Sequence, residues 1–342
     1  MKVRMESRFV RSASLGGYVE LVRSLGHDPH RLLRQVGLSA KLLDNPENRI
    51  AVDAVRELLE ITAQTTATED LALRLAEARH LADLGPISLI LQEEATPRMA
   101  LNTLCRYLRL LNSSMVMHVE DAGPNVIVQE ELLPGRHIAV RQSVELAIGV
   151  MHRILNKLIG PEWKPVQVCF THRAPSDASI HKKFFGIAAT FGAGFNGIVC
   201  AARDLNKTRE AAPSAMSRFA SNYLERELQR RRLGPVENCR NLILALLPGG
   251  RCTATQVARH LQLDRRTLHR HLSKEGVSFA VVLNQVRNEV VLRHLHESDL
   301  SLTEIAGLLG FASPSGLSHW FRSEFGTSIT DWRRNQLPNR VH

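Results

Sequence analysis

The side chains best placed to do chemistry lie in DRRTLHRHLSKEG, residues 264–276, where arginine and histidine recur at helical spacing. Leu268 and Leu272 are four residues apart, so on a helix they share one face and can turn it toward a core. The opposite face carries Arg265, Arg266, His269 and Arg270. A guanidinium can donate two parallel hydrogen bonds to the two acceptors of guanine in the DNA major groove. By itself the pattern also fits a solvated helix face.

A second segment, EIAGLLGFASPSGLSHWFRSEFG, residues 304–326, repeats the pattern of residues 257–276. The matched residues are Ala258 with Ala306, Leu261 with Leu309, Leu268 with Leu317, Leu272 with Phe321 and Gly276 with Gly326. Their spacing grows from 48 to 50 positions, which indicates a short insertion between the paired helices of the later copy. The outer face of its second helix carries small or polar residues: Ser315, Gly316, Ser318 and His319.

Each copy has the features of a helix-turn-helix unit. Ala258 and Ala306 are small where the second helix must cross the first one closely. Asp264 and Ser313 can cap the second helices, and Pro314 occupies the first position after Ser313. We therefore expect the second helix of each copy to present its outer face to a major groove of DNA. Because the later copy carries small side chains there, it can approach DNA closely but makes fewer direct hydrogen bonds.

The segment FAVVLNQVRNEVVLRHLHE, residues 279–297, lies between the copies and has apolar residues at helical spacing. A helix of this length spans roughly 28 Å at a rise of 1.5 Å per residue. Such a rod can hold two recognition helices about one turn of DNA apart. The pattern predicts that one chain reads two successive major-groove segments.

The first part of the chain mixes helical and strand patterns. Helical periodicity is present in residues 49–64, 96–112 and 141–160. Strand patterns are present in residues 114–132, which predict a hairpin around DAGP, and in residues 166–172 and 197–205. The predicted fold is an α+β N-terminal sensor domain followed by an all-α C-terminal domain with two helix-turn-helix motifs joined by a long helix. The predicted domains are residues 1–212, a helical connector at 213–233, and residues 234–342.

The net charge of +10 and the isoelectric point of about 9.8 favour a polyanionic partner. Residues 213–342 contain 18 Lys and Arg against 11 Asp and Glu, so most of the excess positive charge lies in the last 130 residues of the chain. Many basic proteins bind no polyanion, so charge alone does not decide. Together with the repeated motif, however, the charge indicates double-stranded DNA.

Other classes of site have little support in the sequence. The five cysteines are far apart, without metal-ligand or redox spacing, so we expect reduced thiols, no metal and no cofactor. Cys169, His172 and Asp177 could suggest a nucleophile, but Cys169 lies in an apolar run that favours a buried thiol. The sequence has no run of 18 apolar residues and no signal-peptide core at its start. We expect a cytoplasmic protein that binds no membrane.

The double motif, its connecting helix, Gly310–Phe311 and the closing segment GTSITDWRR, residues 326–334, together resemble the DNA-binding domain of AraC-type bacterial transcription regulators. The resemblance covers about residues 236–337. It implies that Arg266, His269 and Arg270 face bases in one groove, and that Ser315, Gly316, Ser318 and His319 do so in the next. Two residues depart from the family pattern. Ile329 replaces a usual proline, and His319 replaces a common arginine, which could make that contact pH-sensitive because neutral and protonated imidazole bond differently.

The N-terminal part resembles the arabinose-binding N-terminal domain of one AraC-type branch, which includes ornithine-utilisation and virulence regulators. The residues that carry this resemblance are DPHRLLRQVGL at 28–38, the region around 95–112, and residues 166–196. It implies a small-molecule effector, a possible homodimer and RNA polymerase as partners. The family label does not establish that arabinose binds, and the sequence singles out no effector-contacting residue, no operator and no sign of regulation.

Two other function classes compete with a sequence-specific regulator. A non-specific architectural DNA-binding protein would show a steep salt dependence and little preference among sequences. An enzyme that uses the N-terminal domain would need converging titratable groups, and the sequence presents no such set, so we expect no catalysis.

Overall fold

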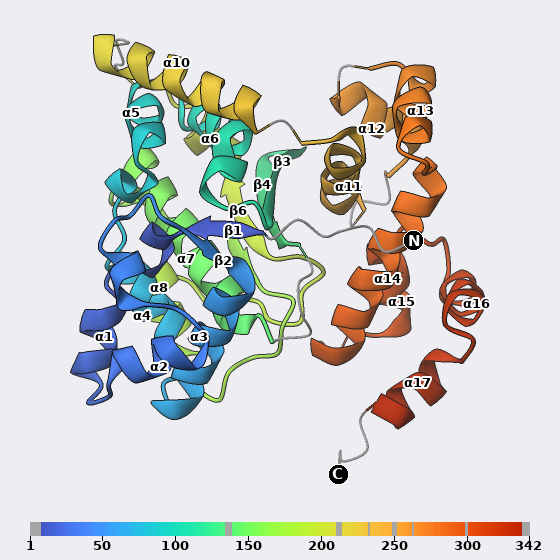
Figure 1. Cartoon of the computed structure of the whole chain (residues 1–342), viewed down its shortest axis with the longest axis horizontal. Coiled ribbons are helices and arrows are strands. Elements are labelled where there is room, and N and C mark those ends of the chain that lie inside the picture. Colours follow the sequence, from blue (N-terminus) through green and yellow to red (C-terminus); the bar gives the residue numbers. More distant parts are fainter. Residues whose placement is uncertain are drawn as a thin grey trace. The chain divides into compact units, whose positions relative to one another are not determined.

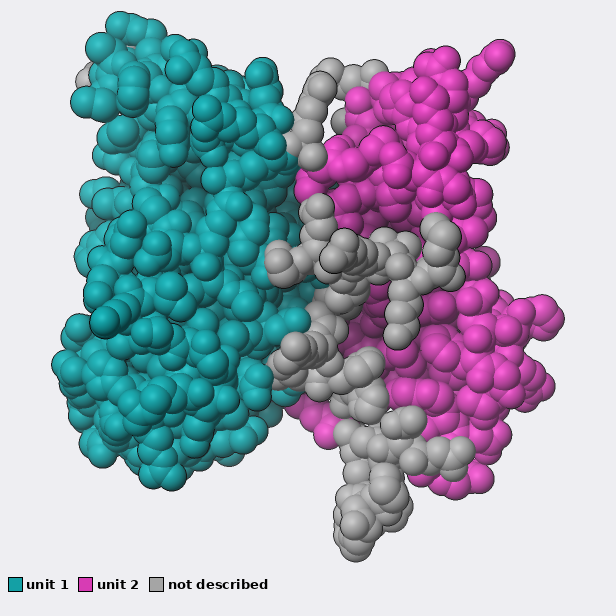
Figure 2. All heavy atoms as spheres, in the orientation of Figure 1, with its two compact units in different colours: residues 1–170, 174–191, 195–232 teal, residues 171–173, 192–194, 233–342 magenta. Residues whose placement is uncertain are grey.

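The computed structural model describes residues 8–133, 139–209, 214–231, 233–247, 252–261, 263–297 and 300–336. The chain divides into two compact units, coloured separately in Figure 2. The N-terminal unit comprises residues 1–170, 174–191 and 195–232, and the C-terminal unit comprises residues 171–173, 192–194 and 233–342. No helix within the described ranges is both long and apolar enough to span a lipid bilayer.

The N-terminal unit is α+β, as predicted (Figure 1). Its α-helices are α1 (Tyr18–Ser24), α2 (Pro29–Gln35), α3 (Val52–Thr65), α4 (Leu71–Glu77), α5 (Pro86–Glu93), α6 (Pro97–Leu111), α7 (Arg141–Ile159), α8 (Ser179–Phe185), α9 (Ala202–Leu205) and α10 (Ala215–Arg230). Short 3-10 helices are η1 (Ser12–Leu15), η2 (Ala40–Leu43) and η3 (Leu81–Leu84). Helix α6 begins as its sequence predicts, because Thr96 Oγ1 accepts a hydrogen bond from Met99 N at 3.1 Å and Pro97 takes the first helical position.

The predicted hairpin is the first part of a four-stranded antiparallel sheet in the order β3-β4-β6-β5. Its strands are β3 (Met115–Ala122), β4 (Asn125–Leu132), β5 (Gln167–Cys169) and β6 (Gly197–Ala201). In β4 every second residue is buried, and these residues are Val126, Val128, Glu130 and Leu132. A carboxyl group therefore lies on the face of β4 that otherwise packs into the core.

Helix α7 is the central element of the unit. It packs against α3, α4 and the sheet, and its side chains Ile148, Met151 and Leu155 are almost fully buried. Gly149 allows α4 to approach closely, because a Cβ at this position would lie 2.7 Å from the Cβ of Ala76. The close fit of α7 to its neighbours makes it the scaffold on which the rest of the unit is assembled.

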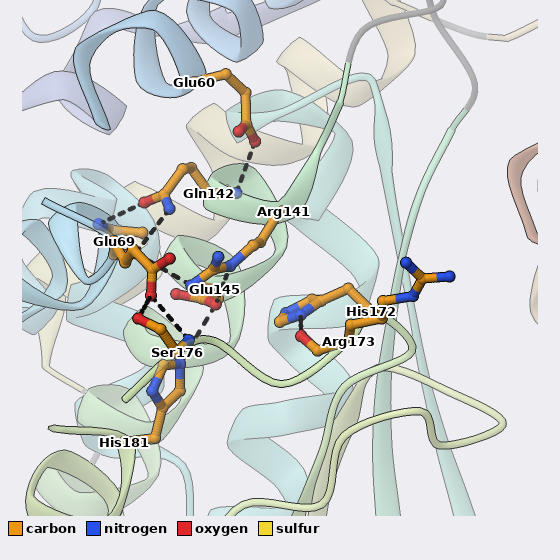
Figure 3. A network of polar contacts seen from close by, with 10 residues as sticks. Glu60, Glu69, Arg141, Gln142, Glu145, His172, Arg173, Ser176 and His181 are labelled. Carbon is orange, nitrogen blue, oxygen red and sulfur yellow. Dashed lines mark hydrogen bonds and ion pairs between the residues drawn. The ribbon is translucent and has the colours of Figure 1, made fainter. Parts of the chain in front are cut away.

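A polar network joins the first turns of α7 to neighbouring elements (Figure 3). Arg141 Nε donates to Glu145 Oε1 at 3.0 Å, and His181 Nε2 of α8 lies 3.3 Å from the same oxygen. The backbone N–H of Gln142 donates to Glu60 Oε1 of α3 at 2.8 Å. The Glu145 side chain is completely buried, and its contacts with Arg141 and His181 offset part of the cost of removing its carboxylate from water.

Helix α10 packs on α5 and α6 within the N-terminal unit. Tyr107 Oη donates to Glu225 Oε1 at 2.5 Å. Arg109 donates from Nη2 to Leu228 O at 2.8 Å and from Nη1 to Arg231 O at 3.0 Å. These bonds attach the segment predicted as a connector to α6. The functional division of the chain at residues 212 and 233 stays a prediction.

Three segments differ from the expectation. Residues 9–11 form β1 (Phe9–Arg11), which pairs with β2 (Arg49–Ala51), so the helix predicted from residue 49 begins only at Val52. The strand predicted over residues 197–205 ends at Ala201, and its second half is helix α9. The strand predicted at 166–172 is limited to β5.

The C-terminal unit is built from α-helices throughout its described residues after 233, as predicted. They are α11 (Pro235–Leu246), α12 (Ala254–His260), α13 (Arg265–Lys274), α14 (Phe279–Glu297), α15 (Leu302–Leu308), α16 (Pro314–Phe325) and α17 (Ile329–Gln336). Helix α14 has the bounds that the sequence predicted. Its buried residues include Val282, Val286 and Val290, and it also buries His294, which the sequence did not single out. Burial lowers the pKa of His294 to about 3.

Candidate nucleic-acid interface

Helices α12 and α13 form the first helix-turn-helix. Ala258 is 1% exposed, which lets α13 cross α12 closely. The backbone N–H of Leu263 donates to Ala258 O at 2.9 Å and closes the turn. Asp264 then caps α13 by accepting from Thr267 N at 2.8 Å and from Thr267 Oγ1 at 2.9 Å. These hydrogen bonds lower the pKa of the Asp264 carboxyl, so it remains an acceptor at neutral pH.

Helices α15 and α16 form the second copy with the same local geometry. Ala306 is also 1% exposed, and the backbone N–H of Phe311 donates to Ala306 O at 2.8 Å. Gly310 adopts φ 70°, a left-handed conformation that glycine takes without steric cost. Ser313 caps α16 by accepting from Gly316 N at 3.2 Å. The turn hydrogen bonds of the two copies are thus 48 positions apart in the chain.

The predicted recognition residues of α13 are all exposed. Leu268 and Leu272 are 1% and 0% exposed and anchor the opposite face in the core. The exposed residues are Arg265, Arg266, His269 and Arg270. The three exposed guanidinium groups can donate to phosphate oxygens and to guanine.

The predicted residues of α16 also share one exposed face, opposite the fully buried Leu317 and Phe321. These exposed residues are Ser315, Gly316, Ser318 and His319. Arg322 is exposed one turn beyond His319 and belongs to the same face. Arg322 was not among the predicted residues, although its helical spacing from Ser318 and His319 was a sufficient signal. Its guanidinium supplies a cation that the small residues of this face lack.

Helix α14 fixes the second helix-turn-helix through the turn itself. Arg287 Nε donates to Leu309 O, at the end of α15, at 2.9 Å. The same guanidinium lies 4.3 Å from the centre of the Phe311 ring, in a cation–π contact. On α16, Glu324 accepts from Asn288 Nδ2 at 3.3 Å and from Asn284 Nδ2 at 3.5 Å. Arg287 of α14 therefore contacts both sides of the turn between α15 and α16, and Asn284 and Asn288 of α14 hold α16 itself.

Helix α11 connects the first helix-turn-helix, formed by α12 and α13, to helix α14. It packs against α12, α13 and α14, and Arg240 of α11 forms an ion pair with Glu289 of α14. Cys239, Ile243 and Leu244 are at most 1% exposed and form its buried side. Both recognition helices are thus anchored in one unit whose central helix is α14.

A family model described as the arabinose-binding domain of AraC transcription regulators, N-terminal, matches residues 26–208, more than half of the chain. The chain belongs to the AraC family of transcription regulators. A second family model, described as a helix-turn-helix domain, matches residues 257–335. These matches confirm the predicted family, the fold class and DNA binding through the helix-turn-helix domain.

The chain resembles several named AraC-family regulators along nearly its whole length. It is 28% identical to the HTH-type transcriptional regulator VirS of Mycobacterium tuberculosis over 95% of this chain and 96% of VirS. It is 26% identical to the ornithine utilization regulator of Pseudomonas aeruginosa over 92% and 93% of the two chains. The crystal structure of the transcriptional regulator CdpR from Pseudomonas aeruginosa covers 91% of this chain and 97% of its own, with 21% identity and a TM-score of 0.44.

Cys169 is 2% exposed, and burial raises the pKa of its thiol to about 11, so it is protonated at neutral pH and a poor nucleophile. Within the described ranges, no group of three or more His, Cys, Asp or Glu side chains is placed to hold a metal ion.

Proposed function

We propose that this chain is a sequence-specific promoter-binding regulator whose recognition helices α13 and α16 read two successive major-groove segments. In this proposal Arg266, His269 and Arg270 contact bases in one segment, and Arg265 contacts the phosphate backbone. The exposed face of α16, with Ser315, Gly316, Ser318 and His319, enters the next segment, where Arg322 adds a cation. The observation that carries the proposal is the attachment of both helix-turn-helix motifs to α14, whose length of roughly 28 Å approaches one turn of DNA.

The N-terminal domain is proposed to bind a small-molecule effector that changes the occupancy of the promoter. An effector acts in this way only if its affinity differs between the DNA-bound and the free protein. The family match to a domain described as arabinose-binding supports a sensor role without naming the molecule. RNA polymerase is the proposed partner at the promoter, and the cytoplasm is the proposed compartment.

A homodimer is proposed to form through α10. Met216, Phe219 and Tyr223 lie on one side of this helix and are 60%, 69% and 48% exposed. Their spacing of three and four residues makes a continuous exposed apolar stripe that borders the buried side of the helix, where Ala220 and Leu224 lie. We expect wild-type protein to show a dimer mass by light scattering, and Phe219→Glu to show a monomer mass because a carboxylate would be buried in the stripe. A dimer mass that is unchanged in this variant would place the interface elsewhere.

The test of DNA recognition is fluorescence anisotropy of the full-length protein on duplexes that tile the DNA upstream of its own and neighbouring genes. Two salt concentrations and a non-specific competitor separate sequence-specific binding from charge-driven binding. We expect one duplex to stay bound against the competitor, and Arg270→Ala to lose it. Equal retention of all duplexes by wild type and variant would overturn the proposal.

A non-specific architectural role is the second candidate, favoured by the net charge of +10. This role predicts uniform binding that disappears as salt is raised, with a slope set by the number of phosphates contacted. The same titration therefore decides between the two functions.

A further inference from the structure

A cavity of about 160 Å³ lies inside the N-terminal unit, lined mainly by α3, α6 and α7, with residues of β1, η1, η3, β3 and β4 completing its wall. On α7 it is lined by Ser143, Leu146, Ala147, Val150, Met151 and Ile154, which lie on one side of the helix. Ser143 and Ala147 are small, so this side of α7 leaves space beside them.

Most of the wall is aliphatic. Val55 and Leu59 of α3 face the cavity, as do Leu104 and Leu108 of α6. An apolar cavity of about 150 Å³ is large enough to bind benzene. The space therefore suits the apolar body of a small molecule, of the size of one aromatic ring or a short acyl chain.

Polar atoms also face this space without partners of their own. Among the described residues, Ser14 Oγ, Ser143 Oγ and Glu130 Oε2 are buried and have no hydrogen-bond partner. Glu130 is only 5% exposed. Buried polar atoms are nearly always hydrogen-bonded in native proteins, and leaving one unpaired costs free energy. Three such atoms in one wall indicate a ligand that pairs with them.

The charges of the wall indicate the kind of partner. Burial raises the pKa of Glu130 to about 8, so at neutral pH its carboxyl is mainly protonated and can donate a hydrogen bond. The charged side chains that line the cavity besides Glu130 are Arg11, Arg56, Arg79 and Asp83. Guanidinium groups only donate hydrogen bonds, whereas hydroxyl and protonated carboxyl groups can both donate and accept. With three arginines against one aspartate, the wall favours a head group that accepts hydrogen bonds.

We infer that this cavity is the effector site, and that its ligand is a small amphipathic molecule with an apolar body and an oxygen head group that accepts hydrogen bonds. The head group is a carboxylate or a neutral carbonyl, and it pairs with Glu130 and Ser143. The inference rests on the proposed effector response and specifies its ligand. A sugar such as arabinose does not fit this site, because aliphatic walls would leave most of its hydroxyls without partners.

The test is calorimetric titration of the full-length protein with four probes. Hexanoate and hexan-2-one carry the two acceptor heads on an apolar chain, hexylamine carries a cationic donor, and L-arabinose is the sugar. We expect saturable binding of hexanoate, of hexan-2-one or of both, and none of hexylamine or arabinose. Failure of both acceptor probes to bind, or binding of arabinose or hexylamine in their place, would overturn the inference.

Variants locate the binding in this cavity. Ala147→Leu fills the space, so it should lower the affinity for the acceptor probe at least tenfold while the thermal midpoint is kept or raised. Ala215→Leu, on the exposed side of α10, is the matched control and should bind as wild type. Glu130→Leu removes the donor and should weaken binding about tenfold, whereas Glu130→Gln keeps an N–H donor and should bind nearly as well as wild type. If Ala147→Leu and Glu130→Leu both bind the acceptor probe as tightly as wild type, the probe does not bind in this cavity and the inference is overturned.

A second readout separates this inference from the proposed function. The affinity for the promoter duplex is measured with and without the acceptor probe. Binding in the cavity without any change in DNA affinity would support the site and reject the effector response. A change in DNA affinity caused by another metabolite, with no acceptor probe bound in the cavity, would reject the site and support the effector response.

Discussion

Single side chains decide whether α13 reads sequence or only charge. Arg270 lies on the exposed face of α13, away from the buried Leu268 and Leu272. We predict that Arg270→Ala costs about 1–3 kcal/mol of binding free energy and relaxes the preference at one base pair, because a bidentate contact to guanine is lost. Anisotropy on the promoter duplex and on its single-base variants measures both effects.

The control for this experiment is Arg203→Ala, which removes the same charge from an 89% exposed side chain in the N-terminal unit. It should leave the base preference unchanged. If Arg270→Ala instead weakens binding to every duplex by the same factor and lowers the salt slope, Arg270 contacts a phosphate rather than a base.

Glu130 makes the stability of the protein depend on pH. Its folded pKa of about 8 lies above the ordinary value of 4.5, so the folded state binds a proton that the unfolded state releases between these values. The stability that comes from Glu130 is therefore complete below pH 4.5 and is lost as the pH rises toward 8. The shift corresponds to as much as about 5 kcal/mol.

We predict that Glu130→Gln, which cannot ionise, gains stability relative to wild type as the pH rises from 5 to 8.5. Urea denaturation of both proteins at the two pH values measures the difference, and groups other than Glu130 cancel in the comparison. The same difference between variant and wild type at both pH values would mean that Glu130 does not titrate in this range.

Individual residue positions were predictable where the pattern is local. The outer face of α13 followed from Leu268 and Leu272, because helical spacing alone separates the two faces. The position of Glu130 could also have been read, since strand alternation places it on the same side as Val126 and Val128. What the sequence could not show is that Glu130 faces a cavity, because that depends on how tightly α3, α6 and α7 pack.

At the level of elements, the turn between α15 and α16 requires the left-handed conformation of Gly310. An alanine there would place its Cβ too close to the following carbonyl oxygen. We predict that Gly310→Ala lowers the free energy of unfolding by about 1–2 kcal/mol. Tryptophan fluorescence during urea denaturation reports on this region, since the ring centres of Trp320 and Phe311 are 5.3 Å apart.

The matched control is Gly307→Ala, three residues earlier. Gly307 lies in helix α15, and a Cβ there would meet nothing within 4 Å. Alanine favours the helix over glycine, so this variant should gain about 0.5–1 kcal/mol. Equal effects at the two positions would show that backbone conformation at the turn is not what limits substitution.

The elements that the sequence predicted well are those with local signals. Helix α14 followed from its apolar periodicity, and α6 followed from Thr96 and Pro97. Strands β1 and β2 were missed, because each has three residues and its partner strand lies about 40 positions away in the chain. No period can be recognised in so short a segment, and the pairing depends on tertiary structure.

At the scale of the whole molecule, a regulator must connect two binding events. The C-terminal unit carries both recognition helices on α14, and the N-terminal unit contains the cavity proposed for the effector. The order of the sequence patterns predicted an N-terminal sensor domain followed by a C-terminal DNA-binding domain. The sequence could not identify the proposed effector site, because residues from eight separate elements contribute to its wall and no short motif contains them.

The link between these sites has a thermodynamic test that needs no knowledge of the path between them. If an effector changes the affinity for the promoter duplex by some factor, the duplex must change the affinity for the effector by the same factor. We predict equal factors, of about 5 to 150 for a coupling of 1–3 kcal/mol. Anisotropy measures the DNA affinity with and without effector, and calorimetry measures the effector affinity with and without duplex.

Ala147→Leu should abolish the coupling and leave the DNA affinity of the effector-free protein unchanged. Unequal factors would mean that a further equilibrium, such as dimer formation, takes part in the response, and repeating both titrations at several protein concentrations would detect it.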